Sequence, residues 1–182
     1  TYLQIYLSLL EKYMDLSEKE RECFVFERSL PLKDKTGKST VIKDGIHIII
    51  PFVNVPYPLQ YVCRHQMIQH PKIVELMTQI GVVNSIDDVI DLSVIERNGW
   101  FMHGSCKPNR EAYSITQIYK IEGENITEID TNTYSDNREL LNILTIRHRT
   151  GWGKLKEDIN PMEIYNELPN KSKGGKKKKV VS

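Results

Sequence analysis

The sequence predicts an α+β protein built on an antiparallel sheet with flanking helices. Stretches rich in valine, isoleucine and aromatic residues are mixed with amphipathic helical stretches, without the regular β–α alternation of a parallel sheet. In addition, the apolar runs at 23–27 and 41–52 are separated by a polar stretch that contains a glycine. This arrangement is typical of two antiparallel strands joined by a hairpin.

The first quarter of the chain supplies one predicted helix and this strand pair. Residues 2–14 have apolar side chains at three- and four-residue spacing, which predicts an amphipathic helix. The run C-F-V-F-E at 23–27 is a short strand that ends before Pro31. We expect the polar stretch 32–39 to be a hairpin loop and residues 41–52 to be the returning strand.

The middle of the chain predicts helices. A helix over residues 59–70 follows two prolines. Pro71 suits the first turn of a second helix, which continues until a glycine ends it. Asn84 or Ser85 can cap the short acidic segment 86–90.

The remaining elements are predicted from the same signals. Strands are expected at 100–105, 113–121 and 126–129, and helices at 136–144 and 162–168. We interpret residues 1–169 as one domain. The lysine-rich stretch 170–182, which contains two adjacent glycines, is interpreted as a basic flexible linker or tail.

Charge is distributed unevenly along the 182 residues. The last twelve residues hold six lysines and no acid, whereas residues 1–170 carry 19 basic and 24 acidic residues, a net charge of −5. The body of the chain is therefore not a broadly basic nucleic-acid binder. We expect any contact with nucleic acid to come from a local patch or from the tail.

Cysteine usage and hydropathy indicate the class of compartment. Cys23, Cys63 and Cys106 are widely spaced and odd in number, which favours thiols in a reducing compartment over a disulfide framework. No apolar run approaches the roughly 20 residues of a membrane-spanning helix, so no membrane partner is expected. The chain begins at Thr1 without a basic and apolar leader, and we interpret it as an excerpt of a longer protein.

Polar residues interrupt the apolar run V-I-K-D-G-I-H-I-I-I-P at 41–51. In one continuous strand Lys43, Gly45 and His47 would share a face, because side chains alternate between faces. A cation, a bare backbone and an imidazole in line would suit a nucleotide phosphate. From the residues alone, the polar face of a solvent-exposed strand is the simpler explanation.

A second stretch of this kind lies about forty residues further on, at 90–108. Asp91 follows Asp87 and Asp88, and carboxylates can hold Mg²⁺ against phosphate oxygens. The first turn of a helix also favours acids, and the residues alone favour that explanation. Asp91 lies between two apolar residues, so we expect it to be partly buried. The sequence G-S-C-K-P at 104–108 suits phosphate contact and equally describes a β-turn.

Two further patterns are weaker. Cys63 and His65, with His103 and Cys106, invite the interpretation of a zinc-stabilised interaction domain, but their spacing does not match paired half-sites. The sequence G-K-S-T at 37–40 resembles the end of a phosphate-binding Walker loop. The first glycine of that loop is missing and no strand–loop–helix context follows, so we interpret it as a hairpin tip.

Taken together, K-D-G-I-H-I-I-I-P at 43–51 and I-D-L-S-V-I-E-R-N-G-W-F-M-H-G-S-C-K-P at 90–108 resemble two motifs of the archaeo-eukaryotic primase superfamily. The resemblance is strongest to the primase part of the primase–helicase proteins of poxviruses and large cytoplasmic DNA viruses. It continues through Y-S-I-T-Q-I-Y at 113–119 and covers about residues 23–149. It implies a primase catalytic core with an RRM-like antiparallel sheet.

The resemblance also implies the site residues. Contacts with the nucleotide are assigned to Lys43, Gly45, His47, Ser105 and Lys107. Gly45 stands at a position that relatives often fill with serine. Asp91 corresponds to one of three metal-binding carboxylates, and it is expected to act in catalysis together with His47. We expect His47 and Asp91 to converge on one pocket for phosphate and cation.

The implied activity is two-metal nucleotidyl transfer that depends on Mg²⁺ or Mn²⁺ and makes primers from nucleoside triphosphates. The implied partners are a single-stranded DNA template, nucleotides and an ATP-binding, NTP-hydrolysing helicase module of the same longer chain. We also expect a homo-oligomer of the parent protein. The implied place of action is DNA replication at viral replication sites in the host cytoplasm.

This sequence departs from the family pattern at two places. Some relatives carry an arginine where this chain has Phe101 and Met102, which leaves His103 as a substitute phosphate contact. No Asp-x-Asp pair of the kind that begins the metal site occurs before Val41; Glu18-x-Glu20 and Glu20-x-Glu22 have the spacing, but we interpret them as part of a charged helical or turn stretch. We therefore expect this partial primase domain to begin downstream of that pair and to be inactive alone. The alternative is a non-catalytic nucleic-acid-binding domain of a replication protein.

Overall fold

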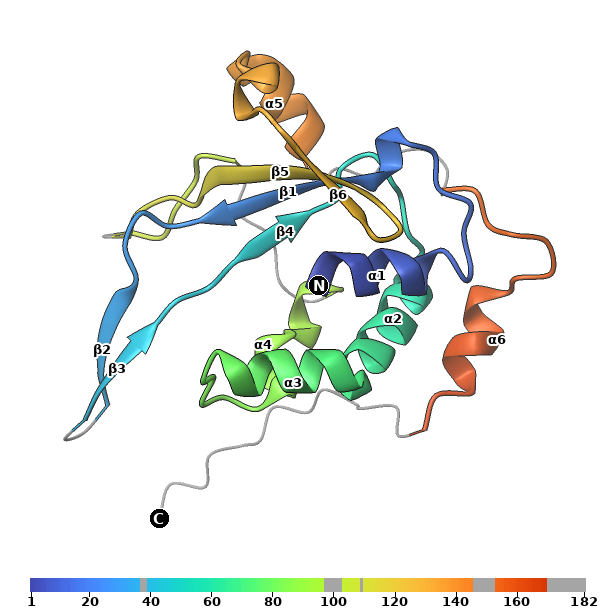
Figure 1. The fold of residues 1–182 in the computed structure, drawn as a ribbon, viewed down its shortest axis with the longest axis horizontal. Helices are drawn as coiled ribbons and strands as arrows, with labels where there is room; N and C mark the ends of the chain where they lie inside the picture. The colour runs from blue at the N-terminus through green and yellow to red at the C-terminus, as the bar shows by residue number, and fades with distance from the viewer. Residues whose placement is uncertain (37–38, 97–102, 109, 146–152, 170–182) are drawn as a thin grey trace. The chain divides into compact units, whose positions relative to one another are not determined.

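A computed structural model describes residues 1–36, 39–96, 103–108, 110–145 and 153–169 (Figure 1). The chain folds into two compact units. One consists of Thr1–Asn54 and Trp100–Leu155, and the other of Val55–Gly99 and Lys156–Ser182. Among the described helices, none has both the length and the apolar character needed to cross a membrane.

The first unit holds an antiparallel sheet. Its described elements are α1 (Tyr2–Leu10), η1 (Lys19–Arg21), β1 (Glu22–Glu27), β2 (Leu32–Thr36), β3 (Ser39–Lys43), β4 (His47–Ile49), β5 (Ser114–Glu122), β6 (Asn125–Ile129), η3 (Thr131–Tyr134) and α5 (Asn137–Leu144). The main sheet has the order β4-β1-β5-β6, and every neighbouring pair is antiparallel. The predicted α+β class with an antiparallel sheet is therefore confirmed.

The predicted pairing of the first two apolar runs is also confirmed, but the second run is not one strand. β1 pairs with β4, and Phe26 lies opposite His47. The run breaks between β3 and β4, where the Asp44 carboxylate accepts a hydrogen bond of 2.8 Å from the backbone N–H of Gly45. Such a local bond competes with a strand ladder. Consequently, the prediction of a continuous strand over 41–52 is wrong.

The stretch expected to be a loop at 32–39 is mostly strand. β2 and β3 form a separate hairpin in which Thr36 lies opposite Ser39. The predicted hairpin is therefore present, but its tip is shorter than expected. The tip itself, residues 37–38, lies outside the described residues.

Apolar side chains pack on both faces of the main sheet. On one face Phe24, Phe26 and Ile118 meet the buried side chains Tyr134, Leu140 and Leu144 of η3 and α5. On the other face Cys23 and Ile121 meet Leu7 of α1. Figure 1 shows α1 and α5 on opposite sides of the sheet. The alternation of side chains along β1 explains why the neighbours Cys23 and Phe24 belong to different clusters.

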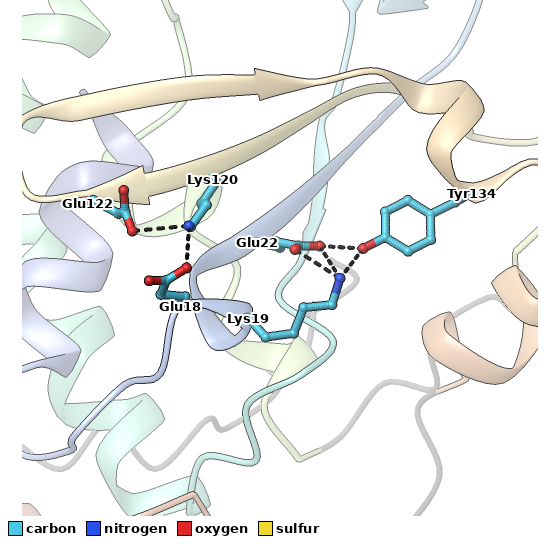
Figure 2. Close-up of polar contacts among 6 residues, drawn as sticks. All are labelled: Glu18, Lys19, Glu22, Lys120, Glu122 and Tyr134. Atoms are coloured by element: carbon cyan, nitrogen blue, oxygen red, sulfur yellow. Dashed lines mark hydrogen bonds and ion pairs between the residues drawn. The ribbon is translucent and has the colours of Figure 1, made fainter.

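A network of charged and hydroxyl groups lies at the start of β1 (Figure 2). The buried carboxylate of Glu22 accepts hydrogen bonds from the Lys19 ammonium at 2.9 Å and from the Tyr134 hydroxyl at 2.5 Å. The Lys19 ammonium also donates to the Tyr134 oxygen and lies 4.5 Å from the ring centroid of Phe52. Burial lowers the pKa of Lys19, but the bonds to Tyr134 and Glu22 outweigh this effect and raise it overall.

A second, more exposed set of ion pairs lies beside this network. The Lys120 ammonium lies 2.8 Å from a carboxylate oxygen of Glu18 and 3.1 Å from one of Glu122 (Figure 2). Hydrogen bonds from Lys120 lower the pKa of Glu18, and the two carboxylates raise the pKa of Lys120. Exposed pairs of this kind contribute little to stability.

The second unit is helical. Its described elements are α2 (Tyr57–Gln69), α3 (Pro71–Gln79), α4 (Ile86–Val89), η2 (Leu92–Val94) and α6 (Pro161–Asn166). Pro71 opens α3 as predicted, and the Ser85 side chain caps α4. The buried guanidinium of Arg64 joins α2 to the following segment, because it donates to the backbone oxygens of Asp87 at 2.7 Å and Ile90 at 2.6 Å.

The later predictions have mixed outcomes. The strands β5 and β6 and the helices α5 and α6 lie where the sequence predicted them, within a few residues. The expected strand at 100–105 is wrong in its described part, because 103–105 form a turn and coil. Residues 170–182 lie outside the described residues, and the division into a 1–169 domain and a basic tail stays a prediction.

All three cysteines lie in the described residues, and none is part of a disulfide. Cys23 and Cys63 are buried, whereas Cys106 is exposed. Burial, with the Glu22 carboxylate nearby, raises the pKa of Cys23 to about 12. Cys23 therefore behaves as a small apolar core residue at neutral pH.

Candidate nucleotide-binding site

His47 is the best-defined of the predicted site residues. It is the first residue of β4, and its backbone is held opposite Phe26 of β1. Its half-buried ring stacks on Tyr113, with ring centroids 3.9 Å apart and planes 16° from parallel. Burial and the positive charge of Arg28 lower the pKa of His47 below its usual value. The lowered pKa favours the neutral imidazole, and the paired strand and the stacked tyrosine hold the ring in place.

Gly45 lies against the same tyrosine. A Cβ atom added to Gly45 would be 3.3 Å from the hydroxyl oxygen of Tyr113, which is closer than an ordinary van der Waals contact. The glycine therefore leaves room for Tyr113 beside His47. The sequence predicted that a ligand would need this space, whereas the structure shows a side chain of the protein in it.

Arg28 is a candidate that the sequence analysis missed. Its guanidinium carbon lies 4.9 Å from the ring centroid of Tyr113, so Tyr113 contacts both Arg28 and His47. The Nε of Arg28 is buried and has no hydrogen-bond partner among the described residues. No motif marked this arginine, because it follows β1 in a stretch that resembles an ordinary strand end. Only the fold brings it to Tyr113, which lies 85 positions further along the chain.

The predicted phosphate contacts of the second stretch lie in the first unit, on the segment 103–108. Ser105 and Lys107 are both exposed there, after Gly104 with its positive φ of 78°. His103 is half-buried, and its ring meets the edge of Phe26 with centroids 6.1 Å apart. Its Nδ1 is buried without a hydrogen-bond partner among the described residues. The role of His103 as a substitute phosphate contact stays a prediction.

Lys43 is exposed at the end of β3, in the hairpin rather than in the main sheet. Because the run breaks after Lys43, the simple alternation that put Lys43, Gly45 and His47 on one face does not apply. The continuous strand that would have placed them on one face is therefore absent. The assignment of each residue to nucleotide contact stays a prediction.

Asp91 belongs to the second unit, whereas the other five predicted site residues belong to the first. It caps η2, where its carboxylate accepts bonds from the backbone N–H of Ser93 at 2.8 Å and from the Ser93 hydroxyl at 2.7 Å. Asp91 is exposed, so the expectation of partial burial is wrong. The cause is the cap itself, which turns the carboxylate toward the start of a surface turn. Its approach to His47 stays a prediction.

The described residues do not form a metal centre by themselves. Across these parts of the chain, no three or more histidine, cysteine, aspartate or glutamate side chains stand together as a set of metal ligands. Asp91 would supply a single carboxylate, whereas a Mg²⁺ or Mn²⁺ site needs several oxygen ligands. The four residues of the zinc hypothesis belong to different units, since Cys63 and His65 lie in the second unit and His103 and Cys106 in the first.

Comparison with known proteins identifies the family. The family described as the C962R protein N-terminal AEP domain matches residues 1–119, which include all six predicted site residues, Arg28 and Tyr113. The chain belongs to this family of archaeo-eukaryotic primase domains. It is also similar to the putative helicase L207/L206 of Acanthamoeba polyphaga mimivirus, with 27% identity over 183 residues. That match covers 91% of this chain and 18% of the relative. No solved structure matches the chain.

Proposed function

We propose that this chain is the nucleotide-binding part of a primase domain in a longer viral primase–helicase. The whole protein would use nucleoside triphosphates to synthesise primers on single-stranded DNA. Membership of the archaeo-eukaryotic primase family supports the primase part of this proposal. The mimiviral relative, which is named a putative helicase, supports the longer protein with a helicase module.

One observation carries the nucleotide-binding role. His47 is held at the start of a paired strand, stacked on Tyr113 and close enough to Arg28 for the arginine charge to lower its pKa. A neutral imidazole in a fixed orientation can donate one hydrogen bond to a phosphate oxygen. The neighbouring cation would favour a negatively charged ligand at the same place.

We assign to this chain the binding and orientation of the triphosphate. The proposal includes no chemical step at a metal ion. In the whole protein we expect Mg²⁺ or Mn²⁺ to be required, with Asp91 as one ligand and the others outside the described residues. The 182-residue chain alone is then expected to bind nucleotide without making primers. NTP hydrolysis by the helicase module, assembly of the parent into a homo-oligomer and action at cytoplasmic viral replication sites belong to the same proposal.

The test is primer synthesis by the full-length protein on a single-stranded DNA template, with nucleoside triphosphates and Mg²⁺ or Mn²⁺. His47→Ala and Asp91→Ala should each reduce synthesis by about 100-fold or more, because the first removes a group that orients the reacting triphosphate and the second removes a proposed metal ligand. His65→Ala is the matched control. It removes an imidazole from α2 in the second unit, where the Nε2 of His65 lies 3.0 Å from the side-chain nitrogen of Gln69.

Two results would count against this proposal. Unchanged synthesis in both His47→Ala and Asp91→Ala would reject the site. A full-length protein that binds single-stranded DNA but makes no primers with either metal would favour the alternative of a non-catalytic binding domain. In that case, loss of salt-dependent DNA affinity on deletion of residues 171–182 would locate the binding in the basic tail.

A further inference from the structure

Arg28 occupies an unusual electrostatic position. Its Nε is buried without a hydrogen-bond partner, and within the described residues Arg28 forms no ion pair. A buried donor without an acceptor costs roughly 1–3 kcal/mol, and more when the group is charged. A protein that keeps such a group at this cost has left a donor available for an acceptor that the chain does not supply.

The acid that precedes Arg28, and the acid that binds the residue after it, have hydroxyl partners of their own. Glu27 precedes Arg28, but its carboxylate accepts a hydrogen bond of 2.6 Å from the Thr116 hydroxyl. The carboxylate of Glu111 accepts one of 2.5 Å from the hydroxyl of Ser29, which follows Arg28. Both carboxylates therefore bind hydroxyl groups, and neither forms an ion pair with Arg28 among the described residues.

Tyr113 holds this arginine next to His47. The Arg28 guanidinium lies over the Tyr113 ring, an arrangement that fixes the plane of the guanidinium. The same ring stacks on His47 at 3.9 Å. A second buried nitrogen without a partner among the described residues, Nδ1 of His103, lies on a ring that packs against Phe26 of β1, two residues before Arg28 in the sequence. Two buried side-chain nitrogens that have no partner among the described residues therefore lie near the end of β1.

We propose that Arg28 is a further nucleotide-binding residue whose guanidinium binds a phosphate of the incoming nucleotide, and that Tyr113 is the positioning residue that aligns Arg28 and His47. This inference rests on the proposed function and adds a residue to its site. A phosphate suits the position because two of its oxygens match the planar fork of donors on a guanidinium. It would give the buried Nε the acceptor that the described residues do not provide.

The experiment measures binding to the full-length protein by calorimetry, with ATP, inorganic triphosphate and adenosine as three separate probes. Arg28→Met should weaken the affinity for ATP and for triphosphate about tenfold or more, because a charge-assisted hydrogen bond is lost. Affinity for adenosine should not change. Arg28→Lys should restore part of the loss, since lysine keeps the charge but not the fork. Arg138→Met, which removes an exposed arginine of α5 in the same unit, is the matched control.

The positioning role of Tyr113 needs a readout taken on variants whose amide spectrum shows the native fold, because unfolding would also raise the pKa of His47. NMR titration of His47 provides it. Tyr113→Leu should lower ATP affinity and also raise the pKa of His47, as Arg28→Met should, because the stacked ring no longer covers the imidazole and the Arg28 charge is no longer held beside it. Tyr113→Phe keeps the ring and should retain both the affinity and the titration of the native protein. An unchanged His47 pKa in Tyr113→Leu would refute the positioning role.

The failure of this inference differs from the failure of the proposed function. Native ATP affinity in Arg28→Met, together with weakened affinity in His47→Ala, would overturn the role of Arg28 alone. If Arg28→Met binds ATP with native affinity but loses affinity for an oligothymidylate, Arg28 contacts the template instead. That result would also overturn its nucleotide-binding role. A native protein that binds neither ATP nor triphosphate would overturn both proposals.

Discussion

The two ends of strand β1 differ in whether a buried polar group has a hydrogen-bond partner within the described residues. At the first end, the Glu22 carboxylate is buried and has two donors, Lys19 and Tyr134 (Figure 2). At the second end, Arg28 follows the strand with a buried Nε that has no acceptor among the described residues. Both ends belong to one sheet in one unit, so the difference does not come from a different fold.

This difference separates a structural network from a binding site. A buried charge whose donors and acceptors are all provided by the chain stabilises the fold and leaves nothing for a ligand. A buried donor that the chain leaves unpaired costs stability, and this cost is offset only when a ligand supplies the acceptor. The contrast makes different predictions for substitutions at the two ends, and these predictions can be measured with the same method.

The largest effect is expected at the first end. Glu22→Ala should lower the local free energy of unfolding of β1 by about 2–3 kcal/mol, because the buried hydroxyl of Tyr134 and the Lys19 ammonium lose their shared acceptor. Amide hydrogen exchange at Phe24 and Val25 in the centre of β1 measures this loss directly. It also avoids the assumption that two units unfold as one.

A nearby carboxylate provides the control for this measurement. Glu122→Ala removes one of two acids at Lys120, and the side chain of Glu122 is 46% exposed, compared with 10% for Glu22. Its expected cost is below about 0.5 kcal/mol. Equal losses in Glu22→Ala and Glu122→Ala would show that burial of the network contributes nothing, and the comparison between the two ends would then lose its basis.

A smaller effect is expected where Gly45 meets Tyr113. Gly45→Ala places a Cβ atom 3.3 Å from the Tyr113 hydroxyl oxygen and should cost about 1 kcal/mol through overpacking. In a Tyr113→Phe background the crowding oxygen is gone, so the same substitution should cost less. A double-mutant cycle measured by hydrogen exchange at β4 gives the coupling. A coupling of zero would show that the Tyr113 hydroxyl is not the reason why a side chain is disfavoured at position 45.

The fold was largely predictable because its signals are local. The apolar runs that became β1, β5 and β6 and the spacing that became α2 and α5 are read within ten residues or so. The break between Lys43 and His47 was missed, because an apolar run with valine and isoleucine gives no sign that the Asp44 carboxylate will accept a bond from the next N–H. Local side chain–backbone bonds of this kind compete with a strand without changing its hydrophobic pattern.

The site was less predictable because it is assembled from distant residues. His47 was found through a motif, and its environment follows from β1 and from Tyr113, which lie on either side of it in the sequence. Arg28 belongs to no motif and becomes a candidate only when burial of its Nε is known. Asp91 was chosen by resemblance, whereas its local role as the cap of η2 depends on a serine two positions later. Sequence patterns thus indicate residue types, and only the fold shows which donors stay unpaired.

The pH dependence of stability should reveal the state of His47. Burial and the charge of Arg28 lower its pKa in the folded protein, so the unfolded chain binds more protons around and below the usual pKa of histidine, about 6.5. The stability that depends on a neutral His47 is therefore fully present above that pH, and it is lost as the pH falls through the lowered pKa. The loss should be modest because the ring is half exposed. A His47→Gln variant should lose less stability between pH 7 and pH 5, measured by hydrogen exchange at β4. An equal loss in both proteins would contradict the assignment.

The smallest effect on stability is expected at Arg28, and it distinguishes the two ends most sharply. Arg28→Met keeps an unbranched apolar chain over the Tyr113 ring and removes a buried donor that has no acceptor among the described residues. The free energy of unfolding of β1, measured without nucleotide, should therefore change by less than about 0.5 kcal/mol or increase slightly. With ATP present, the native protein should gain protection and Arg28→Met should gain less, because stabilisation by a ligand follows its affinity. If Arg28→Met instead destabilises β1 as much as Glu22→Ala does, the arginine is part of the structural framework and both ends of the strand serve the fold alone.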